Sequence, residues 1–367
     1  MPVRGSPLFS AVIGALLISG SATAATREWS GGSATTNNFS DSANWVGATP
    51  PIAGDSVRFP AGVPRLSPID DFVGASNSFF VIGLQSGGYT LSGTGANTLV
   101  VSFVSNGAGT NSLAASLPLQ LGVFGTGLAT QTGSALTVNG PIDLNGRTLE
   151  LNGGLNDLAT GTNSDGRGTL FLNGVISGTG TVNGRFGIIR INAANTFTGT
   201  TAILNGALVY VNGALGPLNL VSGALLGIGS TGTVTASGGI VEPGDDAPGI
   251  LNTGTLSMLS SKLLVEADGP AVGTQYDQLN VTGTVTLGGD VMLELVGAGV
   301  PIGTVLTIVN NDGNDAVSGT FTGLPEGAQV TLGDTLLSIS YVGGTNANDV
   351  TLTAIELPIF SDGFEEL

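Results

Sequence analysis

The fold is decided by one stretch of sequence, Asn195-Thr-Phe-Thr-Gly-Thr-Thr-Ala-Ile-Leu-Asn-Gly-Ala-Leu-Val-Tyr-Val-Asn-Gly-Ala-Leu-Gly216. It predicts a short strand at 202–204, a corner at Asn205-Gly206 and a second strand at 208–211, because Asn and Gly accept the positive φ of a tight corner. Short strands separated by such corners are typical of a chain that winds in stacked coils.

The same pattern extends on both sides of this stretch. Alternating apolar residues predict strands with one buried face. The inward residues are Leu136, Val138, Leu149, Leu151, Leu170, Leu172, Ile189 and Ile191, and the outward ones are Thr137, Glu150, Phe171 and Arg190. Asn-Gly pairs follow most of these strands, at Asn106, Asn139, Asn145, Asn152, Asn173, Asn183, Asn205 and Asn212. Asn152 and Asn173 are 21 residues apart and Asn183 and Asn205 are 22 apart, which is one coil of a parallel β-solenoid.

Asn-Gly pairs are also the commonest turns of antiparallel hairpins, so a β-sandwich is the competing interpretation. A hairpin needs a second strand directly after the turn. Leu149-Glu-Leu-Asn152 is followed instead by Gly-Gly-Leu-Asn-Asp-Leu-Ala-Thr-Gly, which favours the solenoid.

The predicted fold class is therefore all-β, a parallel β-helix (solenoid) with a C-terminal β-rich module. The charge distribution places a boundary near residue 260, because no Lys or Arg follows Lys262. The predicted segments are a signal peptide at 1–24, a Trp-containing cap at 25–65, solenoid repeats at 66–250, the C-terminal β module at 251–355 and a short tail at 356–367.

Composition excludes most familiar active sites. Gly accounts for 61 of the 367 residues, more than twice its usual share of about 7%. Charged residues account for 10%, less than half of their usual share of about 25%. It contains no Cys and no His, which excludes disulfides, thiolate metal sites and the commonest general base. A net charge of −17 disfavours nucleic acid and anionic lipid as partners.

The first residues predict export. Arg4 precedes an apolar run from Leu8 to Ile18, and Ala22-Thr23-Ala24 has the small residues of a cleavage site. We expect an extracellular or outer-surface protein with no membrane span after signal removal, because no later segment is apolar over eighteen residues or so.

Both tryptophans, Trp29 and Trp45, lie in the predicted cap. They fit a sugar-stacking platform or, as we prefer, the apolar cover of the open end of a β stack.

Two parts of the chain resemble known families of secreted bacterial proteins. Residues 195–216 are similar to the autotransporter-associated β-strand repeat, at the positions Asn195, Phe197, Thr198, Gly199, Thr201, Ile203, Gly206, Leu208, Leu215 and Gly216. From Glu242 to Leu352 the order of motifs resembles the module that closes many large secreted repeat proteins. The resemblance implies an adhesin-like β-solenoid, here without the translocator barrel. The tail from Phe360 to Phe364 is similar to short tails of some secreted proteobacterial proteins. The resemblance implies an export or surface-retention signal, and a frayed end with two aromatic contacts is the competing interpretation.

One charged grouping invites comparison with β-helical polysaccharide lyases and hydrolases, which need paired carboxylates or a base beside several Asp. It consists of Asp157, Asp165, Arg167, Arg185 and Arg190. Its two Asp lie in a Gly/Thr/Asn-rich loop, where Asp normally bonds its own backbone. We therefore predict no catalytic residues and keep a carbohydrate-active enzyme as the alternative.

Calcium is the one cofactor that the sequence suggests, because it needs only oxygen ligands. Two Asx-rich loops, Asn310-Asn-Asp-Gly-Asn-Asp315 and Gly343-Gly-Thr-Asn-Ala-Asn-Asp349, offer Asp312, Asp315 and Asp349 as ligands. The competing interpretation is that both loops are ordinary polar turns. We likewise interpret Asp245-Asp246 as a turn rather than as an acid pair.

The sequence as a whole predicts a secreted or cell-surface structural and adhesive protein, whose partners would be glycans, matrix or other cell-surface components. A β-helical carbohydrate-active enzyme and a calcium-stabilised matrix or coat component are the two alternatives.

Overall fold

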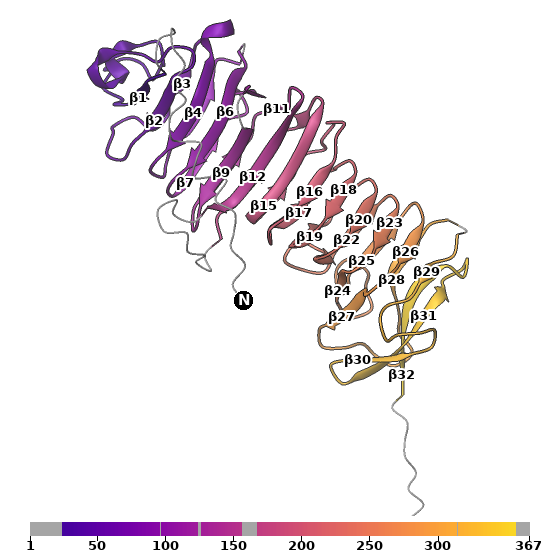
Figure 1. Cartoon of the computed structure of the whole chain (residues 1–367). Coiled ribbons are helices and arrows are strands. Elements are labelled where there is room, and N and C mark those ends of the chain that lie inside the picture. Colours follow the sequence, from indigo (N-terminus) through magenta and orange to yellow (C-terminus); the bar gives the residue numbers. More distant parts are fainter. Residues whose placement is uncertain (1–23, 96, 124–125, 156–166, 314, 357–367) are drawn as a thin grey trace, which may run out of the picture.

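The computed structural model of the chain describes residues 24–95, 97–123, 126–155, 167–313 and 315–356. In these ranges the regular structure is almost all β, with three short 3-10 helices, η1 (Ser42–Asn44), η2 (Val46–Ala48) and η3 (Gly74–Ser76). The protein is elongated, and successive strands lie side by side along its length (Figure 1). Apart from Ala24 and Glu356, the predicted signal segment and tail lie outside the described residues.

A first column of parallel strands runs nearly the length of the described chain. Each strand pairs in parallel with the next in this column, with register shifts only where β12 meets its two neighbours. Its members are β1 (Thr26–Glu28), β2 (Ser56–Phe59), β4 (Ser78–Leu84), β6 (Leu99–Asn106), β9 (Thr126–Gln131), β12 (Arg147–Leu155), β15 (Gly180–Ile191), β16 (Thr201–Ile203), β18 (Leu218–Leu220), β20 (Val234–Ala236), β23 (Leu256–Met258), β26 (Val285–Leu287) and β29 (Ser318–Gly319).

A second parallel column alternates with the first along the chain, and the long strand β15 contributes to both. Its pairs are again parallel throughout. Besides the second half of β15, it contains β3 (Ile69–Asp70), β5 (Thr90–Gly93), β7 (Thr110–Leu113), β10 (Ala135–Val138), β13 (Thr169–Leu172), β17 (Leu208–Val211), β19 (Ala224–Gly227), β21 (Ile240–Pro243), β24 (Lys262–Glu266) and β27 (Met292–Val296).

The remaining strands form a short parallel series and a separate six-stranded sheet. The short series is β8 (Leu119–Leu121), β11 (Ile142–Asp143) and β14 (Ile176–Ser177). The six-stranded sheet starts with the parallel strands β22 (Ile250–Thr253), β25 (Gln278–Val281) and β28 (Val305–Asn311). It continues in antiparallel pairing with β32 (Asp349–Ile355), β31 (Thr335–Gly343) and β30 (Gln329–Leu332).

The alternation predicted from the sequence is confirmed. All eight apolar residues named as inward are buried, each with 0% of its surface exposed. Several of their partners on the neighbouring strands are also buried aliphatic residues, as in the row from Leu136 through Leu170 to Ile189. The core is therefore a continuous cluster of mainly aliphatic side chains between the columns. Burial of their apolar surface stabilises the stacked strands.

The antiparallel alternative fails between residues 130 and 240, since every described strand from β10 to β21 pairs in parallel. Parallel pairing also crosses both predicted domain boundaries. It joins β2 to β4 across residue 65 and β20 to β23 across residue 250. The change to antiparallel pairing comes later, where β28 meets β32.

The expectation that Asn and Gly take positive φ at the corners is wrong for most of the eight Asn-Gly pairs. Both residues have positive φ only at Asn145-Gly146 and Asn205-Gly206. At Gly174 and Gly213 the φ is not positive, and a different constraint applies. A Cβ on Gly174 would lie 1.9 Å from the backbone oxygen of Gly140, and a Cβ on Gly213 would lie 2.0 Å from that of Ala193. Close backbone approach, rather than turn geometry, therefore requires glycine there.

None of the helices among the described residues is long and apolar enough to cross a bilayer.

Candidate functional site

Two of the three arginines in the charged grouping considered above, Arg185 and Arg190, form ion pairs with carboxylates outside that grouping. Arg185 pairs with Glu150 of the neighbouring strand β12. Arg190 pairs with Asp245 and Asp246, which follow β21. Arg167 is exposed, and Asp157 and Asp165 lie outside the described residues. In the described part of the chain, Arg185 and Arg190 thus bind different carboxylates and share none.

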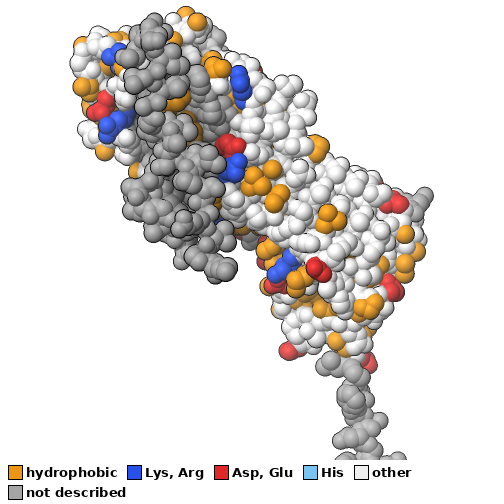
Figure 2. Space-filling view, in the orientation of Figure 1, with side chains coloured by type: hydrophobic (Ala, Val, Ile, Leu, Met, Phe, Trp, Pro, Cys, Tyr) orange, Lys and Arg blue, Asp and Glu red, His pale blue; other side chains and the backbone are white. Residues whose placement is uncertain are grey.

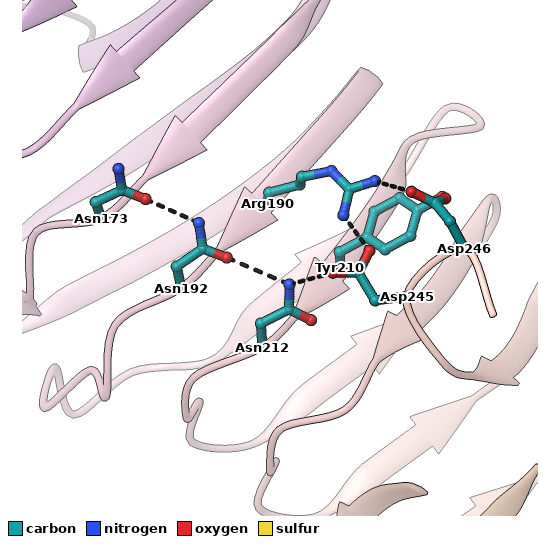
Figure 3. A network of polar contacts seen from close by, with 7 residues as sticks. All are labelled: Asn173, Arg190, Asn192, Tyr210, Asn212, Asp245 and Asp246. Carbon is teal, nitrogen blue, oxygen red and sulfur yellow. Dashed lines mark hydrogen bonds and ion pairs between the residues drawn. The ribbon is translucent and has the colours of Figure 1, made fainter. Parts of the chain in front are cut away.

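Arg190 is the centre of the largest polar network in this region (Figure 3). Its guanidinium carbon lies 4.0 Å from the ring centroid of Tyr210, which sits in register with it on the adjacent strand β17. The Tyr210 hydroxyl donates to Asp246 Oδ1 at 3.1 Å, and Arg190 Nη2 donates to Asp246 Oδ2 at 2.6 Å. The network fastens the segment after β21 onto the outer face of β15 and β17.

In this network the positive charge of Arg190 is balanced by the carboxylates of Asp245 and Asp246. Burial on its own would lower the pKa of Arg190, but hydrogen bonds and charges from Asp245 and Asp246 outweigh it and raise that pKa. Burial, together with the hydrogen bond to Asp246, raises the pKa of Tyr210 to about 12. Both groups therefore keep their protons at neutral pH, and neither is suited to act as a general base.

A ladder of asparagines runs into the same network (Figure 3). Each is the residue directly after a strand of the second column, and the side-chain amide of each later asparagine donates to the asparagine of the preceding strand in the column. Asn173 donates to Asn139 at 2.8 Å, Asn192 to Asn173 at 2.8 Å, and Asn212 to Asn192 at 3.3 Å. Asn212 also donates to Asp245 Oδ2 at 2.8 Å, so the carboxylate closes the ladder.

A second asparagine ladder lies along the six-stranded sheet. Asn280 donates to Asn252 and Asn310 donates to Asn280, both at 3.1 Å. These three residues face each other in register on β22, β25 and β28. In both ladders the amides act as regular polar links between successive strands.

Both tryptophans are buried, with 0% of Trp29 and 3% of Trp45 exposed. Their rings meet edge to face at 5.2 Å. The indole of Trp29 donates to Arg65 O at 2.9 Å and that of Trp45 to Phe39 O at 2.7 Å. No ring face is free to stack on a sugar, so these residues belong to the apolar core at the N-terminal end of the described chain.

The two predicted calcium loops, far apart in the sequence, are brought together. Asn311 N–H donates to Asp349 Oδ1 at 2.9 Å, and Asn348 Nδ2 donates to Gly313 O at 2.6 Å. Of the three predicted ligands, Asp349 is 9% exposed, Asp315 is half-buried and Asp312 is exposed. Among the described residues no group of three or more His, Cys, Asp or Glu side chains is arranged to hold a metal.

Comparison with known proteins gives no family for this chain, because no family model matches it and no curated protein is significantly similar to it.

Proposed function

We propose that the chain is a secreted or cell-surface structural and adhesive protein built as a parallel β-helix, with no catalytic activity. Two in-register parallel columns around an aliphatic core support the solenoid architecture. The similarity of residues 195–216 to the autotransporter-associated repeat supports a surface role for it. The export signal predicted at 1–24 supports secretion.

The observation that carries this proposal is a row of small, uncharged side chains on the outer face of the first column. Five of the strands there, β16, β18, β20, β23 and β26, are three residues long with both end residues buried, so the middle residue faces outward. In register, this outer row is Asn183, Ala202, Asn219, Thr235, Ser257, Thr286 and Ser318.

Such a row suits distributed contact with an extended partner. Neighbouring strands are about 4.8 Å apart, so the outer row presents one hydroxyl or amide at nearly every such step. Figure 2 shows that the visible face of the protein carries few charged side chains and much uncharged polar and backbone surface. Many weak hydrogen bonds to the hydroxyls of a glycan, summed along the row, would provide adhesion by avidity.

The outer row gives a direct test of adhesion. Replacing Thr235 and Thr286 by lysine places two charges on it and is expected to lower retention of the purified chain on cells or immobilised glycans about tenfold or more. Thr137→Lys with Thr169→Lys is the matched control, because these threonines are outward-facing on neighbouring strands of the second column. Equal retention of both variants and the parent would contradict an adhesive outer row. Release of product from anionic or neutral polysaccharides, abolished by Arg190→Ala, would instead support the enzyme alternative.

Export is tested separately by cell fractionation. We expect the full-length chain in the medium or at the outer surface, and an increase in the released fraction when residues 358–367 are removed. Immunoblots of medium, outer membrane, periplasm and cytoplasm measure this. Accumulation of the full-length chain in the cytoplasm would refute the proposed localisation.

A further inference from the structure

We propose that the side chains of Asn311, Asp315, Asn348 and Asp349 form a calcium site that ties β28, the last parallel strand of the six-stranded sheet, to the antiparallel hairpin of β31 and β32. This site goes beyond the structural and adhesive function, and it does not depend on it.

The topology places the four residues at one junction. Strand β28 pairs in parallel with β25 up to Asn311 and in antiparallel fashion with β32, which begins at Asp349. Asn348 Nδ2 donates to the carbonyls of Gly313 and Asn311, at 2.6 and 3.1 Å, and Asn311 Nδ2 donates to Asp315 O at 2.7 Å. The amide nitrogen of Asn348 thus holds the two turns together, and that of Asn311 closes its own turn.

Three side-chain oxygen atoms at this junction have no hydrogen-bond partner among the described residues. Asn311 Oδ1, Asn348 Oδ1 and Asp315 Oδ2 are buried, and no hydrogen bond to them is found among the described residues. Asn311 and Asn348 are each only 2% exposed. A buried polar atom without a partner is costly, so three of them in one cluster indicate a missing ligand. Because all three are acceptors, they can be satisfied by a cation or by a hydrogen-bond donor such as water, and the carboxylates in the cluster favour the cation.

The carboxylate of Asp349 adds charge to this cluster. Its Oδ1 accepts the Asn311 N–H, while its Oδ2 lies against the turn, since a Cβ on Gly344 would fall 1.8 Å from that oxygen. Asp315 supplies the second carboxylate. No Lys or Arg occurs anywhere after Lys262, so this part of the chain offers no basic side chain to balance the two charges.

The donor set selects calcium among the common metals. Carboxylate, amide and carbonyl oxygens are the ligands that Ca²⁺ takes, whereas zinc and copper prefer the His and Cys that the chain lacks. Two carboxylates are few for a tight site, which places the expected affinity at about 10⁻⁴–10⁻³ M, the range of extracellular modules. Asp312, which the sequence also offered, is exposed and is not part of the site.

The test is calorimetric titration of the full chain with calcium chloride after treatment with EDTA. We expect about one Ca²⁺ per chain and a rise in melting temperature of about 2–4 °C at about 5 mM calcium. Magnesium at the same concentration is expected to give a smaller shift, because it sheds water reluctantly. No heat of binding and no shift with calcium would overturn the proposal.

Variants locate the site. Asp315→Asn is expected to weaken calcium binding at least tenfold, whereas Asp312→Asn, three residues away in the same turn, should bind like the parent. Circular dichroism without calcium verifies that each variant is folded. Parent-like binding by Asp315→Asn, or loss of binding in Asp312→Asn, would show that calcium binds elsewhere and would overturn the assignment. If Asp315→Asn fails to fold, the absence of calcium binding by the parent still overturns the proposal, and Asp312→Asn still tests whether calcium binds at the exposed carboxylate instead.

Discussion

Replacing Gly213 by alanine is expected to destabilise the protein by about 3 kcal/mol or more, the upper end of what overpacking usually costs. The new Cβ would lie 2.0 Å from the carbonyl oxygen of Ala193 and 2.3 Å from its carbon. Both are backbone atoms, held by hydrogen bonds such as Ala214 N–H to Ala193 O at 3.1 Å. The stack must therefore open locally to admit one methyl group. The midpoint of urea unfolding, followed by circular dichroism, measures the loss.

Gly216 provides a matched control three residues further along the same turn. A Cβ there would lie 3.6 Å from the nearest atom, Gly199 O, which is an ordinary contact. Its φ is not positive, so Gly216→Ala is expected to be neutral or to stabilise by about 0.5 kcal/mol through the unfolded chain. If both variants unfold at the same urea concentration, close backbone packing is not the reason that position 213 requires glycine.

These two glycines show what the sequence could and could not predict. The pair Asn212-Gly213 resembles Asn205-Gly206, and the sequence predicts a positive-φ corner at both. Only the second has it. The difference arises because Gly213 lies where the backbone of one segment rests on another, and that contact depends on the register between strands distant in sequence.

The strands themselves were predictable because their signal is local. Leu170 and Leu172 alternate with Phe171, and period-two alternation is enough to assign a buried face. The sequence favoured parallel pairing because the residues after Asn152 do not fit a returning hairpin strand. The pairing is parallel, but the predicted strand end was wrong, because Asn152 and Gly153 lie inside β12 and Asn183 and Gly184 lie inside β15. What carried no local signal was the late change to antiparallel pairing at β28 and β32.

The polar networks were predictable only in part, because they too depend on contacts between strands that are distant in sequence. Asn139, Asn173 and Asn212 stand out because a Gly follows each of them, whereas Asn192 is followed by Ala193. Aligning the strands that end at Leu172 and Ile191 would have found it. The partners of Arg190 lie 55 and 56 residues away, and only the three-dimensional stacking brings them to it.

The second large effect concerns two buried carboxyl groups. Burial raises the pKa of Asp70 to about 6, and the neighbouring charge of Asp71 adds to this. Burial likewise raises the pKa of Asp277 to about 7, even though Glu266 N–H and Gly249 N–H both donate to its carboxylate at 2.8 Å. Their exposed fractions are 2% and 0%, so solvent does little to relieve either charge.

The free energy of unfolding is therefore expected to fall as the pH rises from about 4.5 to about 8. Below the ordinary pKa of 3.8, both carboxyls are protonated in the folded and the unfolded chain. Between that value and the raised values, the folded chain keeps protons that the unfolded chain has lost, so each increase in pH favours unfolding. For Asp70, a rise of about two pKa units corresponds to about 3 kcal/mol. Urea unfolding at half-unit pH intervals measures the slope.

Asp70→Asn isolates one of the two contributions. Asp70 Oδ2 is buried without a hydrogen-bond partner, so replacing the carboxylate by a neutral amide removes a buried charge without breaking a bond to that atom. We expect the variant to be about 2–3 kcal/mol more stable than the parent at pH 8 and to differ little from it at pH 4.5. Asp334→Asn, at an exposed position, should leave the pH dependence unchanged. A parent-like slope in Asp70→Asn would mean that Asp70 is ionised in the folded chain throughout this range and that its burial is offset by contacts made to its charged form.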